Sequence, residues 1–194
     1  MNNSIIQEIL AEKKDSQVLE IIFKNHGDIF GGYIRDRIAS RVANDIDVLI
    51  PFSARREFEA EMTKLYPVRK VDEKNGATIF TGSDACPCEV FYIDEEVSTN
   101  TIGLLTEPDV DINTLSYNPE KGLRNWITGD QNVDVIVDHI KKGICAKYSL
   151  CDPRRLRKIK AKGWIVLPEE IPSMSEEECE RMDKMWETGN CEQQ

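Results

Sequence analysis

Gly31-Gly32-Tyr33-Ile34-Arg35-Asp36, followed after eight residues by Asp45-Ile46-Asp47, is the most informative stretch of this 194-residue chain. Glycine has no Cβ, so the Gly31-Gly32 pair lets backbone N–H groups approach an anion. Residues 45–50 predict a strand, in which side chains two positions apart point to the same side. Two carboxylates beside such a turn favour Mg²⁺, which takes oxygen ligands and shares them with substrate phosphates. The pattern indicates phosphoryl or nucleotidyl transfer.

The same residues resemble the signature of the DNA polymerase β-type nucleotidyltransferase superfamily. The similarity is to its class II branch, which contains CCA-adding tRNA nucleotidyltransferases and bacterial poly(A) polymerases. That signature runs Gly-Gly-x-hydrophobic-Arg-Asp, a short helix, a basic turn and Asp-x-Asp. The resemblance implies that Gly31 and Gly32 cradle a triphosphate, with Arg35 nearby. From the residues alone, a structural ion pair between Arg35 and Asp36 is an equal alternative.

The chemistry of this superfamily calls for a third carboxylate on a neighbouring strand. Glu89 lies in the apolar run of residues 88–93, where an acid is costly to bury unless a metal ion or cation compensates it. The alternative is an edge-strand glutamate that faces water. The resemblance implies that Glu89 joins Asp45 and Asp47 as catalytic residues and metal ligands, with two Mg²⁺ ions as cofactor and Mn²⁺ as a substitute.

A second match lies at residues 109–119. Asp109 and Asn113 fit a family motif whose implied role is contact with the nucleotide sugar. The two arginines that precede this motif in the family are replaced by Glu107 and Pro108. Without the resemblance, the segment is an ordinary turn and strand.

A third, weaker match lies at residues 151–155. Asp152 and Arg155 fit the family element that reads the incoming base, but Cys151 replaces its glutamate, so the choice of nucleotide cannot be carried over. Asp152 before Pro153 is also a favourable helix start, and this structural interpretation fits equally well.

The implied activity is metal-dependent transfer of a nucleoside monophosphate from an NTP to a hydroxyl acceptor. An RNA 3′ end is the acceptor that the family suggests, and a small molecule or a protein hydroxyl is the alternative. The competing interpretation is a catalytically degraded module that binds a nucleotide or a partner protein. The changes at 94, 107, 108 and 151 favour that module, whereas retention of both Asp45 and Asp47 favours an enzyme. A third interpretation is a structural subunit that binds through Met182, Met185 and Trp186.

Composition limits these interpretations. A net charge of −10 argues against a general polyanion binder, although residues 154–163 contain six cations. No apolar run reaches the ~20 residues of a membrane span, and the first residues do not resemble a secretory signal, so we expect a cytoplasmic protein with no membrane partner. The cysteines are expected to be reduced packing residues, because Cys86-Pro87-Cys88 has no second close pair or nearby histidine to complete a zinc site.

The order of elements predicts an α+β fold: a small mixed β-sheet, palm-like nucleotidyltransferase head flanked by helices, with a short helical neck. We expect the head at residues 1–120 and the neck-like subdomain, with an acidic C-terminal helix near 175–187, at residues 121–194. Helices are predicted at 3–24 (one or two), 33–40, about twelve residues from Ser53, 131–142 and 152–161. Strands are predicted at 28–30, 45–50, 68–71, 77–81, 89–93, 112–117 and 164–167.

Overall fold

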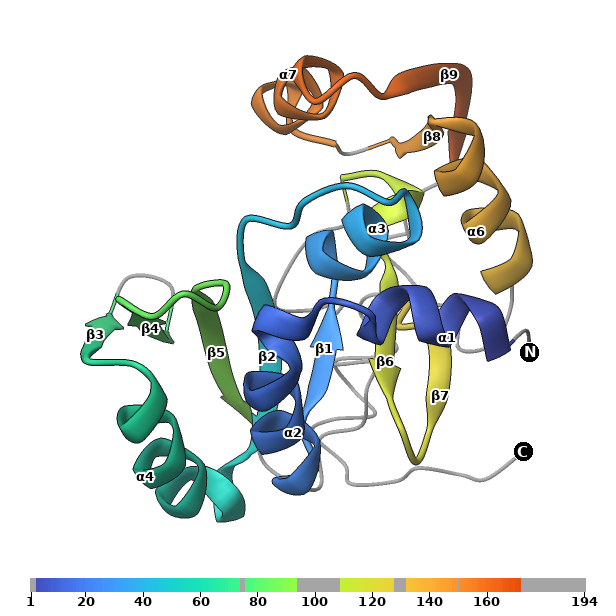
Figure 1. Cartoon of the computed structure of the whole chain (residues 1–194). Coiled ribbons are helices and arrows are strands. Elements are labelled where there is room, and N and C mark those ends of the chain that lie inside the picture. The colour runs from blue at the N-terminus through green and yellow to red at the C-terminus, as the bar shows by residue number, and fades with distance from the viewer. Residues whose placement is uncertain (1–2, 74–75, 94–108, 128–131, 150, 172–194) are drawn as a thin grey trace, which may run out of the picture.

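A seven-stranded mixed sheet is the framework of the molecule (Figure 1). The computed structural model describes residues 3–73, 76–93, 109–127, 132–149 and 151–171. The strand order is β3-β4-β5-β2-β1-β6-β7, in which β2 and β5 run parallel and the other neighbours antiparallel. The strands are β1 (Asp28–Phe30), β2 (Ile46–Pro51), β3 (Val68–Asp72), β4 (Ala77–Thr81), β5 (Cys88–Ile93), β6 (Leu115–Asn118) and β7 (Gly122–Asn125).

In the described residues, two α-helices precede β1, one lies between β1 and β2, one lies between β2 and β3, and two follow β7. Two of them, α1 and α2, pack against the sheet on the side that faces the viewer in Figure 1. The α-helices of the described ranges are α1 (Asn3–Leu10), α2 (Ser16–Lys24), α3 (Gly32–Ile38), α4 (Arg55–Leu65), α6 (Val133–Lys142) and α7 (Pro153–Ala161). Short 3₁₀ turns lie at Lys13–Asp15, Phe52–Ala54 and Asp111–Asn113. The predicted α+β class with a mixed sheet is confirmed.

Successive side chains of β2 point alternately to the two faces of the sheet. Ile46, Val48 and Ile50 are buried in the large core, which also contains the apolar residues of α2. Asp47 and Leu49 alternate with them, so they point to the opposite face. Leu49 belongs to a second, smaller apolar cluster on that face. The face that carries Asp47 is therefore not the face that α2 covers.

The described residues after β7 form α6, which lies at the upper right of the sheet in Figure 1, and α7 and a two-stranded sheet, which lie above it. The strands of this small sheet, β8 (Ile144–Tyr148) and β9 (Ile165–Ile171), run parallel. The boundary expected at residue 120 falls in the turn between β6 and β7, and β7 belongs to the main sheet. The acidic helix expected near 175–187 lies outside the described residues, as do Glu107 and Pro108.

Several elements differ from the predictions. The strands at 122–125 and 144–148 were not predicted, and the strand expected from residue 112 begins at Leu115, after the 3₁₀ turn. The helix expected from Ser53 begins at Arg55, because residues 52–54 form a 3₁₀ turn first. Of the helices in the described ranges, none combines the length and apolar character that a membrane span requires.

The described cysteines are free thiols. Cys86, Cys88 and Cys145 are buried, and Cys151 is half-buried. Burial raises the pKa of Cys86 to about 11 and the pKa of Cys145 to about 12, which keeps both as neutral thiols at physiological pH. For these residues the packing interpretation is confirmed.

The pair Asp111–His139 joins the turn before β6 to α6. Asp111 Oδ1 accepts the N–H groups of Ile112 at 2.8 Å and Ala146 at 2.9 Å. Its Oδ2 lies 2.6 Å from His139 Nδ1. Burial raises the pKa of Asp111, and the contact with His139 opposes that rise. One buried carboxylate thus links three segments: the turn, α6 and β8.

We expect Asp111→Asn to lower the free energy of unfolding by ~1–2 kcal/mol, because the amide keeps an oxygen acceptor but loses the charge-assisted contact with His139. Urea unfolding at pH 7 measures this change. Asp138→Asn is the matched control on α6, because Asp138 is exposed and pairs only with Lys142 in the described chain. An equal loss in both variants would contradict the structural role of Asp111.

Candidate active site

The glycine turn brings the start of α3 against the carboxylate strand. Gly31 adopts φ +70° and ψ −128°, a conformation that favours glycine. A Cβ on Gly31 would lie 3.5 Å from Asp47 Oδ2. The N–H of Gly31 donates to Leu115 O at 2.9 Å, so the expectation that both glycine N–H groups face a phosphate is wrong for Gly31. Gly32 begins α3, where the first N–H groups have no acceptor within the helix.

The two glycines should therefore respond differently to substitution. We expect Gly31→Ala to lower the free energy of unfolding by ~1–2 kcal/mol, because an L side chain is strained at positive φ. Gly32→Ala should change stability by less than ~0.5 kcal/mol, because its Cβ would meet Arg35 Nη2 at an ordinary 3.5 Å. Thermal unfolding of both variants tests the comparison, and equal effects would show that the turn does not require glycine at 31.

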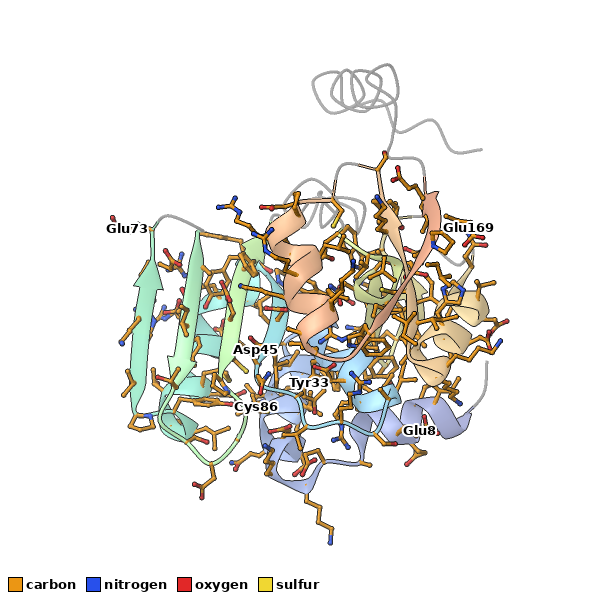
Figure 2. All side chains as sticks on the ribbon, turned by 90° about the horizontal axis from the view of Figure 1, so that it is seen from above. Glu8, Tyr33, Asp45, Glu73, Cys86 and Glu169 are labelled. Atoms are coloured by element: carbon orange, nitrogen blue, oxygen red, sulfur yellow. The ribbon has the colours of Figure 1, made fainter. Side chains whose placement is uncertain are left out.

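Asp47 and Glu89 lie on one face of the sheet, and Asp45, labelled in Figure 2, comes just before β2. The expected set of three carboxylate ligands is not grouped closely enough to form a metal site by itself within the described residues. Asp47 pairs in register with Phe30 of β1 and with Glu89 of β5, and in-register neighbours share a face of the sheet. Asp45 immediately precedes β2 and is exposed, and its charge acts on both Asp47 and Glu89. The edge-strand alternative for Glu89 is wrong, because β5 lies between β4 and β2.

This arrangement concentrates negative charge. Burial and the charges of Asp45 and Glu89 raise the pKa of Asp47 to about 7, while Arg155 and Arg35 oppose the rise. Burial, with Asp45 and Asp72, also raises the pKa of Glu89. Within the described ranges, no three His, Cys, Asp or Glu side chains are grouped closely enough to hold a metal ion by themselves. The donor set fits Mg²⁺ as one or two carboxylates do when substrate phosphates complete the shell.

A chain of polar contacts links the glycine turn to α7. Arg35 Nη1 donates to Asn113 Oδ1, and Asn113 Nδ2 donates to Asp109 Oδ1 at 2.8 Å. Arg155 Nε then donates to Asp109 Oδ2 at 3.0 Å. These four residues were predicted as nucleotide-binding residues, and the structure places them in one continuous network. The other side of the Arg35 guanidinium pairs with Asp36, with Nε–Oδ1 and Nη2–Oδ2 both at 2.7 Å.

Asp152 stands apart from this network. Its Oδ1 accepts the N–H of Arg154 at 2.7 Å, and Pro153 follows as the first residue of α7. The Arg154 side chain also pairs with Asp152 and lowers the pKa of its carboxyl. The helix-start interpretation of Asp152 is confirmed: among the described residues its carboxylate contacts Arg154, whereas Arg155 contacts Asp109.

Two tryptophans that sequence reasoning did not select support the site. Trp126 Nε1 donates to Asn113 O at 3.3 Å, and its ring packs with Phe30 and Leu49 on the face of the sheet that carries Asp47. Trp164 is buried, and the Arg35 guanidinium lies 5.8 Å from its ring centroid. Trp126 lies in none of the motifs, and Trp164 was predicted only as an apolar residue of the strand at 164–167, so only the tertiary structure places both beside the site.

Comparisons with known proteins agree with this architecture. Neither a protein-family model nor a curated protein sequence matches the chain. Among solved structures, a CCA-adding enzyme with CTP aligns with 97% of this chain at a TM-score of 0.60 and 15% identity. The Thermotoga maritima CCA-adding enzyme complexed with tRNA aligns with 84% at 0.60 and 16% identity, and a CCA-adding enzyme with ATP with 80% at 0.58 and 18% identity.

The chain spans less than half the length of these structures, which it covers to 45%, 42% and 39% respectively. At such low identity the likeness concerns the fold alone. The fold that the resemblance at residues 31–50 implied is therefore confirmed: this chain has a fold similar to that of the aligned part of CCA-adding enzymes.

Proposed function

We propose that the chain is a metal-dependent nucleotidyltransferase that moves a nucleoside monophosphate from an NTP to a hydroxyl acceptor. One observation carries the proposal. Asp47 lies against the glycine turn at Gly31 and in register with Glu89, with Asp45 adjacent, and its carboxyl has a raised pKa. A cluster of carboxylates that raises the pKa of one member is electrostatically unfavourable, and such clusters are typical of functional sites. The fold of CCA-adding enzymes supports the same reaction class.

Asp45, Asp47 and Glu89 would supply the protein ligands for Mg²⁺, one or two carboxylates for each ion with substrate phosphates completing the shell, and Mn²⁺ would be a substitute. When bound, two such ions reduce the charge on the triphosphate and activate the acceptor oxygen. Asp47 would release its proton as it becomes a ligand, so the metal affinity should increase as the pH rises toward 7 and above.

The surrounding residues would bind and orient the nucleotide. Gly32 offers a backbone N–H at the start of α3, and Arg35 holds the side chain of Asn113 in place. Asp109 and Asn113 would address the sugar. Arg155 would address the base once it leaves Asp109, and Asp152 would fix the start of the helix that carries it.

The solved relatives guide the choice of substrates. Their structures are described as complexes with CTP, ATP and tRNA. For this chain we propose an NTP as donor and an RNA 3′ end as acceptor. A small-molecule or protein hydroxyl is the other acceptor class to test, because the chain covers less than half of those enzymes.

The experiment is transfer of label from each of the four NTPs to mixed short RNAs, with Mg²⁺ or Mn²⁺. We expect incorporation that requires the metal and disappears in the Asp45→Ala/Asp47→Ala variant. Asp138→Ala is the control, because Asp138 is an exposed carboxylate on α6 that pairs with Lys142. Specific NTP binding without transfer to RNA or small hydroxyl acceptors would contradict the enzyme and support the degraded binding module.

A further inference from the structure

A basic groove lies at the C-terminal ends of α3 and α6, which Figure 1 shows side by side and which are in contact. Its volume is about 340 Å³, near the lower end of the range for small-molecule sites. No carboxylate lines it, and three of its eight lining residues are cations. The lining consists of Ile38, Ala39, Ser40, Arg41, Ile140, Lys141, Lys142 and Gly143.

Arg41 is held in position before any ligand arrives. Its Nη1 donates to Lys162 O at 2.9 Å, and its guanidinium lies 4.3 Å from the ring centroid of Trp164. The remaining donors of this guanidinium have no partner in the described chain. A fixed guanidinium with free N–H groups is suited to bidentate binding of a phosphate, and little side-chain entropy is lost on binding.

Two residues that line the groove have positive φ angles, and one of them is not a glycine. Ser40 adopts φ +54° and Gly143 adopts φ +71°, each just beyond the end of its helix. Glycine suits this conformation, whereas serine is strained there. The exposed hydroxyl of Ser40 has no partner among the described residues and lines the groove. A ligand that accepts a hydrogen bond from the Ser40 hydroxyl would explain why serine, and not glycine, occupies this strained position.

We propose that this groove is a second anion site, which binds a phosphate group through Arg41, Lys141 and Lys142. It is distinct from the carboxylate site, because it lies at the end of α3 whereas Gly31 and Gly32 lie at its start, about 10 Å away along the helix. The overall charge of −10 makes a cluster of three cations less expected by chance. Lys142 Nζ pairs with Asp138 Oδ2 at 2.6 Å, whereas Arg41 and Lys141 have no carboxylate partner within the described residues. The inference does not depend on the proposed transfer reaction.

A competing explanation for Lys141 and Lys142 is that they stabilise α6, because they lie in its last turn and cations interact favourably with the negative end of the helix dipole. It does not account for Arg41, which lies three residues beyond the end of α3. The two explanations differ in their consequences. A dipole role affects stability alone, whereas a binding site predicts saturable binding of phosphate.

The test follows the backbone amide resonances of Ser40, Arg41 and Gly143 while phosphate, pyrophosphate or a short RNA without terminal phosphates is added. The protein carries Asp45→Asn and Asp47→Asn and the buffer contains EDTA, so the carboxylate site cannot contribute a metal. We expect saturable shifts at these amides. Lys141→Gln/Lys142→Gln and, separately, Arg41→Gln should each weaken binding by about 10-fold.

Lys64→Gln/Lys70→Gln is the charge-matched control, since both lysines are exposed on α4 and β3. Saturation by phosphate or pyrophosphate alone would assign a small ligand, and saturation by the RNA alone would assign a phosphodiester backbone. Shifts confined to residues 31–35, no saturation, or equal weakening in the control would overturn the proposal. Transfer activity without phosphate binding in the groove would refute this inference but not the proposed function. Phosphate binding in the groove without transfer activity would support this inference and contradict the proposed function.

Discussion

Asp47→Asn should make the metal-free protein more stable above pH 7 while reducing nucleotidyl transfer by at least about 10²-fold. In the folded protein, burial and the neighbouring acids Asp45 and Glu89 raise the pKa of Asp47 from 3.8 to about 7. An ionised Asp47 is therefore unfavourable in the native state. Asparagine removes that charge with little change of shape, so the free energy of unfolding at pH 8 should rise by ~1–3 kcal/mol.

The sign follows from proton binding. Between about pH 4 and pH 7 the folded state retains the Asp47 proton and the unfolded state does not, so the stability contributed by this group falls as the pH rises. It is fully present below about pH 4 and is lost above about pH 7. The difference between Asp47→Asn and the wild type should thus be near zero at low pH, grow through this window and level off.

Urea unfolding in EDTA from pH 4.5 to 8.5 measures this difference. Asp84→Asn, at an exposed loop position, should give a flat profile. Added Mg²⁺ should stabilise the wild type above pH 7 and leave Asp47→Asn almost unchanged, because a ligand that binds only the folded state raises stability. A variant that is less stable than the wild type at pH 8 in EDTA would show that Asp47 carries no charge penalty.

The local parts of this site could be predicted from the sequence because strand alternation and glycine conformation are local properties. The apolar residues at 46, 48 and 50 identify the face of β2 that is buried in the large core. Asp47 alternates with them and must therefore lie on the opposite face. Glu89 could be selected because it is an acid within an apolar strand. Its register opposite Asp47 required the parallel pairing of β2 and β5, which the sequence does not encode in any local pattern.

The long-range parts could not be predicted. The contact between Arg155 and Asp109 joins residues 46 positions apart, and the network through Asn113 depends on how α7 packs above the sheet. The strand β7 (Gly-Leu-Arg-Asn) contains glycine and asparagine, and β8 (Ile-Cys-Ala-Lys-Tyr) contains alanine and lysine. These residue types are depleted in strands, so neither segment has a clear strand signal. The Gly31 N–H was assigned to a phosphate because its partner Leu115 O comes from a strand far along the chain.

Asp36→Asn is expected to cause the largest loss of stability, about 3–4 kcal/mol, with a fall in melting temperature of about 10 °C. The side chains of Arg35 and Asp36 are only 3% and 9% exposed, and both carboxylate oxygens accept from the guanidinium. Removing the carboxylate charge leaves a buried cation whose other acceptor is the neutral Asn113. Thermal unfolding measures the loss. Glu120→Gln is the control, because its pair with His26 is about two-thirds exposed on both sides.

A double variant separates the structural role of this pair from its role in the site. Arg35→Met/Asp36→Leu removes both buried charges, so it should be more stable than Asp36→Asn alone, although it has lost two polar partners. It also removes the donor that fixes the Asn113 side chain, so nucleotide binding should remain weakened even where stability returns. Recovery of both stability and binding would show that Arg35 serves only its ion pair. Recovery of stability alone would place Arg35 among the residues that position the nucleotide.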